Sequence, residues 1–136
     1  MTIEYTYKNL VKDLAKINRD IAISEWKPEY IIGIKRGGLI PAIMLSHYWN
    51  VPLHIFEITK EPHIPSQGEF LLVDDINDSG ETLKHAKNMI YLYGNTINKM
   101  NLKTVTLIDC PQSIFEVDFY GREKNSEEWV KFFWEI

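Results

Sequence analysis

The chain has 136 residues, the usual length of one domain, and we expect a single hydrophobic core. Apolar residues make up 45% of it and charged residues 25%, a composition that excludes a disordered chain. The net charge is -4, the basic residues are scattered, and no apolar run approaches the ~20 residues of a bilayer span, so we expect neither nucleic acid nor a membrane as a partner.

The first predicted element is an amphipathic helix at residues 7–21, where apolar side chains recur every three or four positions. Residues 30–34 then predict a short strand that is buried on both faces. Residues 39–49 are apolar on almost every side and predict a helix packed inside the fold, and residues 53–58 predict a second strand. This alternation is typical of a βαβ unit.

Three further elements continue the alternation: a strand at residues 70–75, a helix at 80–93 that Gly94 closes, and a strand at 104–109. The predicted fold class is therefore α/β, a single domain with a mainly parallel sheet flanked by helices and with ligands at the carboxyl ends of its strands. Residues 115–136 mix aromatic and charged side chains without a clean period, so we expect them to cap the sheet instead of extending it.

The most informative stretch is residues 71–82, Leu-Leu-Val-Asp-Asp-Ile-Asn-Asp-Ser-Gly-Glu-Thr. An apolar strand ends there in a turn that opens the next helix, so backbone N–H groups and the positive end of the helix dipole meet at one point. Ser79 and Thr82 can donate further hydrogen bonds, and Gly80 lets the backbone approach a ligand closely. This point suits a phosphate group.

Two carboxylates lie beside the phosphate turn. Asp74 and Asp75 can accept hydrogen bonds from a ribose diol or hold a hydrated Mg²⁺ through oxygen ligands. From the residues alone, an acidic strand end that merely caps a helix, or the acidic pocket of a phosphorylated receiver domain that uses Asp74, stays open.

The whole stretch resembles the signature of type I phosphoribosyltransferases that binds phosphoribosyl pyrophosphate (PRPP), in which hydrophobic residues, two acidic residues and a D-[ST]-G-x-T loop follow one another. The resemblance implies that Asp74, Asp75 and Asp78 are catalytic, that Asp74 and Asp75 hold Mg²⁺ directly or through water, and that Asp78 faces N7 of a purine. It also implies a site for the 5′-phosphate, made of Asp78, Ser79, Gly80, Glu81 and Thr82.

A second anion-binding turn is predicted at residues 34–41, between the first strand of the βαβ unit and its helix. It is similar to the turn that binds pyrophosphate in purine phosphoribosyltransferases. The resemblance implies a cis peptide between Lys35 and Arg36. It also implies a pyrophosphate site made of Lys35, Arg36, Gly37 and Gly38; read alone, an Arg-Gly-Gly surface turn would be equally expected.

Residues 129–135 resemble the base-binding hood of the xanthine, guanine and hypoxanthine phosphoribosyltransferases, the relatives that the chain resembles most. The expected domain is 1–136, with a core at about 1–114 and this hood at about 115–136. The resemblance implies that the first Trp stacks on the base, and the candidate base-binding residues are Trp129, Val130, Glu135 and Cys110. For Phe132, Phe133 and Trp134 we favour a place in the core or an oligomer contact.

The chain departs from this pattern at three places. Cys110 precedes a proline where the purine enzymes carry a Lys that bonds the 6-oxo group, so Gln112, Lys131 or a different base must be considered. The segment at residues 59–69 is shorter than the usual catalytic loop and lacks its Ser-Tyr pair, although Lys60 and His63 could reach the pyrophosphate. A phenylalanine also replaces the hood proline.

The resemblance implies a nucleotide-salvage enzyme that transfers the 5-phosphoribosyl group of PRPP to a purine-like base and releases pyrophosphate, with Mg²⁺ as cofactor. A non-catalytic PRPP- or nucleotide-binding regulator is the alternative. Relatives commonly form dimers or tetramers, so we expect a homodimer or homotetramer. Because Cys110 is the single cysteine, an internal disulfide is excluded and a cytoplasmic location is expected.

Overall fold

The computed structural model describes residues 1–94 and 100–136. Its main sheet has the strand order β3-β2-β4-β5-β6, and every neighbouring pair in it is parallel. The strands of this sheet are β2 (Tyr30–Ile34), β3 (Leu53–Phe56), β4 (Gly68–Asn77), β5 (Met100–Asp109) and β6 (Phe119–Glu123). The predicted α/β fold with a mainly parallel sheet is therefore confirmed.

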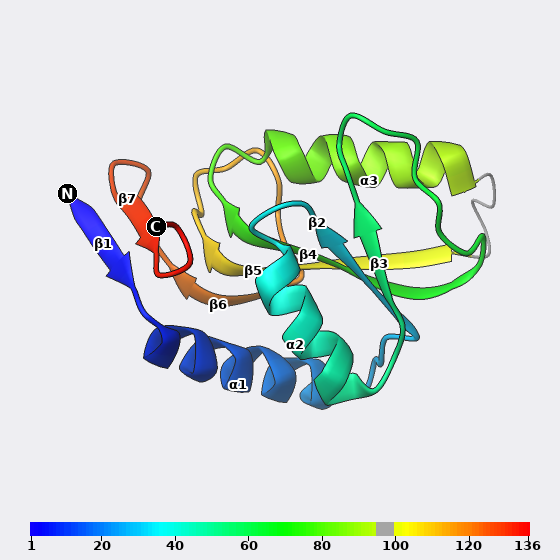
Figure 1. Cartoon of the computed structure of the whole chain (residues 1–136), viewed down its shortest axis with the longest axis horizontal. Coiled ribbons are helices and arrows are strands. Elements are labelled where there is room, and N and C mark those ends of the chain that lie inside the picture. The colour runs from blue at the N-terminus through cyan, green and yellow to red at the C-terminus, as the bar shows by residue number, and fades with distance from the viewer. Residues whose placement is uncertain (95–99) are drawn as a thin grey trace.

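Helices cover both faces of the main sheet, as Figure 1 shows: α1 (Tyr7–Ile23) and α2 (Leu39–Trp49) lie on one face and α3 (Glu81–Gly94) on the other. Each face has its own apolar cluster, since Leu14 of α1 and Leu45 of α2 pack with one set of strand residues and Leu83 of α3 packs with the other. Within the described ranges, no helix has both the length and the hydropathy that a membrane span requires.

The hood contains a two-stranded parallel sheet made from the two ends of the chain (Figure 1). Strand β1 (Thr2–Tyr5) pairs with β7 (Trp129–Phe132), and Thr2 lies opposite Trp129. Strand β1 was not predicted, because four residues are too few to show a period of two.

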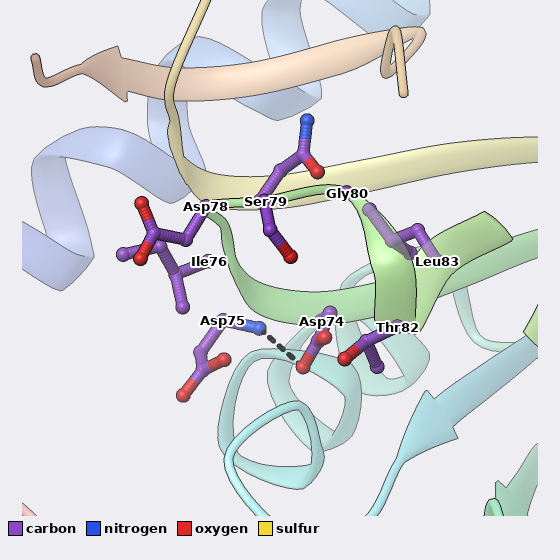
Figure 2. A pocket seen from close by; sticks show the side chains of 9 residues that line it. Asp74, Asp75, Ile76, Asp78, Ser79, Gly80, Thr82 and Leu83 are labelled. Atoms are coloured by element: carbon purple, nitrogen blue, oxygen red, sulfur yellow. Dashed lines mark hydrogen bonds between the residues drawn. The ribbon is translucent and has the colours of Figure 1, made fainter. Parts of the chain in front are cut away.

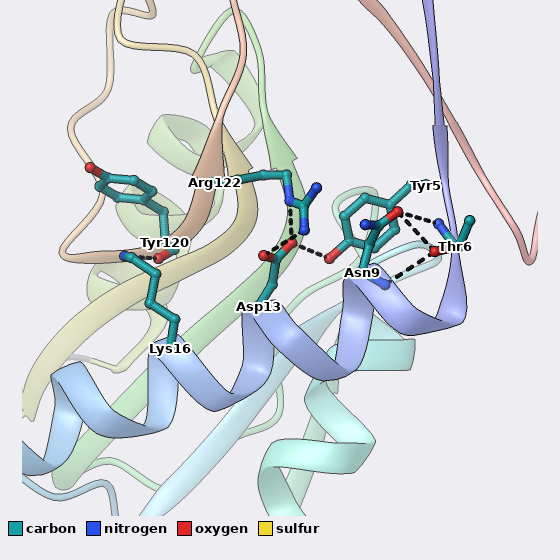
Figure 3. A network of polar contacts seen from close by, with 7 residues as sticks. All are labelled: Tyr5, Thr6, Asn9, Asp13, Lys16, Tyr120 and Arg122. Atoms are coloured by element: carbon teal, nitrogen blue, oxygen red, sulfur yellow. Dashed lines mark hydrogen bonds and ion pairs between the residues drawn. The ribbon is translucent and has the colours of Figure 1, made fainter.

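A buried polar cluster joins this hood to the core, and Figure 3 shows it between α1 and β6. Asp13 of α1 accepts a 2.6 Å hydrogen bond from the Tyr5 hydroxyl and two more, of 2.8 and 3.0 Å, from the Arg122 guanidinium. Burial, and then the hydrogen bond to Asp13, raise the pKa of Tyr5 above its ordinary value. The hood is thus fixed to the sheet through side chains that are far apart in sequence.

Two expectations from the sequence are wrong. Residues 115–136 do not only cap the sheet, because β6 extends it beside β5. The buried positions of β6 are Phe119 and Gly121, and a glycine in the inward row hid the alternation; a Cβ on Gly121 would meet the Asp13 Cβ at 2.5 Å. Helix α2 is not buried all round, since Ile43 and Tyr48 are 44% and 64% exposed.

Candidate active site

The site lies at the point where the chain changes the direction in which it adds strands to the sheet. The chain goes from β2 outward to β3 and returns to β4 on the other side of β2, so the carboxyl ends of β2 and β4 border a crevice. The turn after β2 and the end of β4 meet there. A Cβ on Gly37 would displace the Asp75 carboxylate from its position, so glycine lets the turn lie directly against this side chain.

A cavity of about 190 Å³ lies at the end of β4 and the start of α3. Figure 2 shows the hydroxyl groups of Ser79 and Thr82 and the carboxylate of Asp74 around one space, while the side chain of Asp78 points the other way. Gly80 has a φ of 93°, and a Cβ there would lie 2.7 Å from the backbone nitrogen of Phe115. The turn therefore depends on a glycine at this position.

The amide groups of this turn are available to a ligand. Among the described residues, none accepts a hydrogen bond from the backbone N–H of Ser79, Gly80 or Thr82. The Glu81 N–H instead lies 3.3 Å from Ser79 Oγ, and Glu81 does not line the cavity. Free amides at the start of a 14-residue helix are suited to bind an anion, and the side chain of Glu81 lies outside the cavity beside them.

The two carboxylates at the end of β4 lie next to each other in a partly closed environment. Asp74 is buried and accepts a 2.9 Å hydrogen bond from the amide of Asp75. Burial, followed by repulsion from Asp75, raises the pKa of Asp74 well above its ordinary value, and burial also raises the pKa of Asp75. Both groups therefore gain from a nearby cation.

The carboxylate pair suits Mg²⁺ that is also bound by a substrate. In the part of the chain that the structure describes, no group of three or more His, Cys, Asp or Glu side chains could hold a metal ion by itself. Mg²⁺ commonly takes one or two carboxylates and completes its shell with water and phosphate oxygens. Asp74 and Asp75 fit that mode, because they lie beside the anion site.

The turn after β2 agrees with the resemblance in one respect and corrects it in another. The peptide bond between Lys35 and Arg36 is cis, as predicted. Arg36 and Gly37 line a cleft of about 740 Å³, whereas Lys35 does not line it and its Nζ lies 3.4 Å from Glu57 Oε1. The predicted pyrophosphate role thus fits Arg36 and Gly37 better than the side chain of Lys35.

Gly38 lies beneath this turn, where it is buried and precedes α2. A Cβ on it would lie 2.5 Å from the carbonyl oxygen of Val73 and 2.7 Å from that of Ile34. Gly38 does not line the cleft; it allows the turn to rest against the ends of β2 and β4. Its contribution to a pyrophosphate site is therefore through the shape of the backbone.

A third cavity, of about 200 Å³, separates the phosphate turn from the hood. Trp129, Val130 and Glu135 line it, as the base-site prediction requires, and Asp78 lines it from the opposite side. Trp129 is 69% exposed, which is unusual for this residue type and typical of a ligand platform.

Cys110, the fourth predicted base residue, does not line any of these three cavities. Its side chain is buried, and Sγ lies 3.2 Å from Gln112 Oε1. Its amide donates to the carbonyl oxygen of Asn77. Cys110 therefore fixes the segment that follows β5, and the structure does not bring it to the base cavity.

Sequence reasoning missed Lys124, which lines the same cavity as Trp129. It follows β6, its side chain is only 2% exposed, and its Nζ lies 2.9 Å from Asp78 Oδ1. A single lysine after a short strand usually lies in solvent, so no signal in the sequence distinguished it. The pairing of β6 with β5 is what brings Lys124 to the carboxyl edge of the sheet.

The remaining hood aromatics and the short loop have structural surroundings. Phe132 is buried and stacks on Trp134 with ring centroids 4.6 Å apart, which agrees with the core prediction for both, whereas Phe133 is 42% exposed. In the loop, Lys60 pairs with Glu57 at 3.1 Å, and this hydrogen bond is the main cause of the lowered pKa of Glu57. His63 is exposed.

One carboxylate borders all three cavities. Asp75 lines the phosphate cavity, the cleft beside Arg36 and the cavity beneath Trp129. Asp78 borders the first and the third of these. The three subsites that the motifs predicted separately are therefore continuous around the end of β4.

Comparisons with known proteins agree with this arrangement. A xanthine-guanine phosphoribosyltransferase of Idiomarina loihiensis is 25% identical over an alignment of 144 positions, gaps included, and the match covers 92% of this chain and 84% of the relative. The crystal structure of a purine phosphoribosyltransferase from Pyrococcus horikoshii Ot3 is 26% identical, with a TM-score of 0.83 and coverage of 99% of this chain and 94% of the other. No model of a known protein family matches the chain.

A third match concerns the fold. The xanthine-guanine-hypoxanthine phosphoribosyltransferase of Helicobacter pylori superposes with a TM-score of 0.86 at 21% identity, and the match covers 100% of this chain and 93% of the other. The fold is that of a type I phosphoribosyltransferase. The sequence motifs indicated a resemblance to the xanthine, guanine and hypoxanthine enzymes of this class. The matches confirm that resemblance.

Proposed function

We propose that the chain is a Mg²⁺-dependent phosphoribosyltransferase of nucleotide salvage, which transfers the 5-phosphoribosyl group of PRPP to a purine-like base. The observation that carries the proposal is the turn with Ser79, Gly80 and Thr82, whose amides have no partner among the described residues and which lines a cavity together with Asp74 and Asp75. A phosphate monoester and its attached sugar need this combination of donors and acceptors.

The reaction is a displacement at C1 of the ribosyl group. A ring nitrogen of the base forms a bond to C1, the bond from C1 to the pyrophosphate oxygen breaks, and pyrophosphate leaves with the bonding electrons. The positive charge that develops on the sugar lies near the Asp74 and Asp75 carboxylates, and Arg36 lies in the cleft where the leaving group would be. Catalysis thus comes from position and charge.

Asp78 is the candidate general base. Its carboxylate borders the base cavity and is 59% exposed, so it can move within reach of a purine ring nitrogen. When N9 attacks, the proton on N7 has to leave the ring, and a carboxylate beside that edge can accept it. Trp129 would hold the ring by stacking.

Mg²⁺, when bound, would neutralise charge on the leaving pyrophosphate. Asp74 and Asp75 would hold it, directly or through water, together with oxygens of the substrate. The raised pKa of each carboxyl supports this assignment, because the folded protein itself supplies too little positive charge there. Isothermal titration of PRPP with and without Mg²⁺ tests it: equal affinities in both conditions would contradict a metal role in binding.

The proposed activity is tested by mixing the protein with PRPP, Mg²⁺ and each base of a purine and pyrimidine panel, and measuring pyrophosphate release. We expect release with at least one purine and none with the Asp74→Asn/Asp75→Asn variant. The alternative function, a PRPP-binding regulator, has some support in the short connection between β3 and β4. It would be favoured by PRPP binding without release for any base.

We also propose a homodimer or homotetramer, and a cytoplasmic location. The exposed apolar side chains of Ile43 and Tyr48 on α2 are consistent with a contact between subunits. The free thiol of Cys110 is consistent with the cytoplasm, where thiols stay reduced. Light scattering after size-exclusion chromatography tests the first: a monomeric mass at micromolar concentration would contradict it.

A further inference from the structure

The base cavity contains a buried cation that no predicted site residue supplies. Lys124 is 2% exposed at its side chain and is the only Lys, Arg or His among the residues that line this cavity. Lysine is rarely buried to this degree without a specific set of partners. The cavity is otherwise acidic and apolar, with Asp75, Asp78, Glu128 and Glu135 as its carboxylates.

The ammonium group of Lys124 is held in a fixed direction. It donates to the backbone carbonyl oxygens of Asn125 at 3.1 Å and Glu128 at 3.0 Å, which are neighbours in the turn before β7. An ammonium has three N–H donors, so one remains. That donor faces Asp78 Oδ1 at 2.9 Å.

The partner of this third donor can be exchanged. The two carbonyl groups belong to the backbone of the turn, whereas the Asp78 side chain is 59% exposed and can rotate into solvent at low cost. A ligand oxygen that enters the cavity can therefore replace Asp78 as the acceptor while the ammonium stays in place. In the empty protein, Asp78 satisfies a charge that would otherwise be buried without a partner.

We infer that Lys124 reads the oxo group of a 6-oxopurine, an inference that rests on the proposed transferase function. A purine with an oxo group at position 6 presents an acceptor, O6, next to N7, and a lysine ammonium commonly binds this edge. Lys124 is the donor for O6, and the adjacent Asp78 is the acceptor for a proton on N7. In the empty protein the two groups lie 2.9 Å apart, so a small rotation of Asp78 lets both meet one edge of the base.

A 6-aminopurine does not satisfy this pair. It presents two N–H donors at position 6, so the Lys124 ammonium would face another donor. Because the ammonium is buried, the loss of its acceptor is costly, and sites of this kind discriminate strongly between an oxo and an amino group. The selectivity for oxopurines thus comes from one fixed charge.

The position of Lys124 also accounts for Cys110. The Lys that bonds the 6-oxo group in the purine enzymes precedes a proline after a strand, and Cys110 occupies that position here but is buried against Gln112. Here the cation comes from the end of the next strand, β6. Lys131, another candidate, is exposed on β7 and does not line the cavity.

The test compares hypoxanthine with adenine, which differ at position 6 and in the accompanying N1 proton. The ratio of kcat/KM for the two bases is measured with wild type, Lys124→Met and Lys131→Met. We expect wild type to prefer hypoxanthine, Lys124→Met to lose about 10- to 100-fold of that preference, and Lys131→Met to keep it. A merely structural role for Lys124 would lower both rates equally and leave the ratio unchanged, which would overturn the inference.

Two additions keep the test decisive. Lys124→Gln retains a neutral donor for the carbonyls of the turn, so it should fold if Lys124→Met does not, and it should also lose part of the preference.

Equilibrium binding of IMP and AMP, followed by calorimetry, needs no turnover. If wild type releases no pyrophosphate with any base, the transferase function fails, but a preference for IMP that disappears in Lys124→Met would still support the reading role. Equal binding of IMP and AMP by wild type would overturn it.

Discussion

The phosphate edge and the base hood are built in different ways. At the phosphate edge, one continuous segment, residues 74–82, supplies the carboxylates, the hydroxyl groups and the free amides. In the hood, β1 and β7 come from opposite ends of the chain and are fixed to the core through Asp13 and Arg122. The first region is local in sequence, and the second exists only after the chain has folded.

Because of this difference, substitutions in the two regions should have different effects. Changes at the phosphate edge should affect PRPP and catalysis without unfolding the protein, because the side chains there face a cavity. Changes in the hood should affect base binding and stability together, because its side chains also hold two distant segments in place.

The largest effect is expected from Asp74→Asn/Asp75→Asn. The change removes both charges near the sugar and the proposed metal, so kcat/KM should fall by roughly 10³-fold. The far-UV circular dichroism spectrum should stay that of wild type, since amides fit the same space. Turnover near the wild-type rate would remove the phosphate edge from the mechanism.

The next effect is on the hood anchor. Arg122→Ala leaves the Asp13 carboxylate buried with only the Tyr5 hydroxyl as its partner, and the free energy of unfolding should fall by about 3 kcal/mol. The KM for the base should rise more than the KM for PRPP. Urea denaturation and steady-state kinetics measure the two quantities.

Lys16→Ala is the matched control for that variant. Its pair with Asp20 is more than one third exposed on both sides, and its 2.8 Å hydrogen bond to the carbonyl oxygen of Tyr120 carries no buried carboxylate, so its loss should cost only about 1 kcal/mol. If both variants lose equal stability, the contact between Asp13 and Arg122 is not the special anchor of the hood.

A smaller effect is expected from Trp129→Ala. Loss of a stacking surface worth ~1 to 3 kcal/mol should raise the KM for the base about tenfold and leave the KM for PRPP unchanged. The melting temperature should hardly change, because Trp129 is exposed. Phe132→Ala, which empties a buried position three residues away on β7, should instead destabilise the protein by about 3 kcal/mol. An unchanged base KM in Trp129→Ala would argue against stacking.

The smallest effect is a gain in stability from Asp74→Asn alone. The pKa of Asp74 is raised on folding, so the folded state holds a proton that the unfolded state releases, and stability falls as the pH rises above the ordinary value of 3.8. At pH 7 the Asn variant should therefore be more stable by on the order of 1 kcal/mol.

That gain should disappear as the pH falls below 3.8, where both states of the wild type are protonated. Urea midpoints measured across this pH range test the sign. A variant that is less stable than wild type at pH 7 would mean that the Asp74 charge is already compensated within the protein.

The phosphate edge could be predicted from the sequence because its chemistry is contained in one motif. The buried strand, the glycine at position 80 and the hydroxyl groups all stand within twelve residues, and the structure places most of them around one cavity. Glu81 was the exception, since a residue inside the motif can still turn its side chain away from the cavity.

The hood was predicted only in part, because its partners are distant. The aromatic run suggested Trp129, but nothing near residues 2–5 indicated that they pair with residues 129–132. Strand β6 was missed because Gly121 interrupts the apolar row, and Lys124 was missed with it. Cys110 was assigned to the base site by its position in a motif, although folding turned it inward.

The position of Asp75 at the junction of three cavities has a pharmacological consequence. Ligands in the three subsites sense one shared negative charge, so occupancy of one subsite changes the electrostatic potential at the other two. A compact inhibitor with a positive centre beside Asp75 could extend short arms into two cavities at once. Its affinity would then exceed that of either half, because the second arm would bind at a high effective concentration.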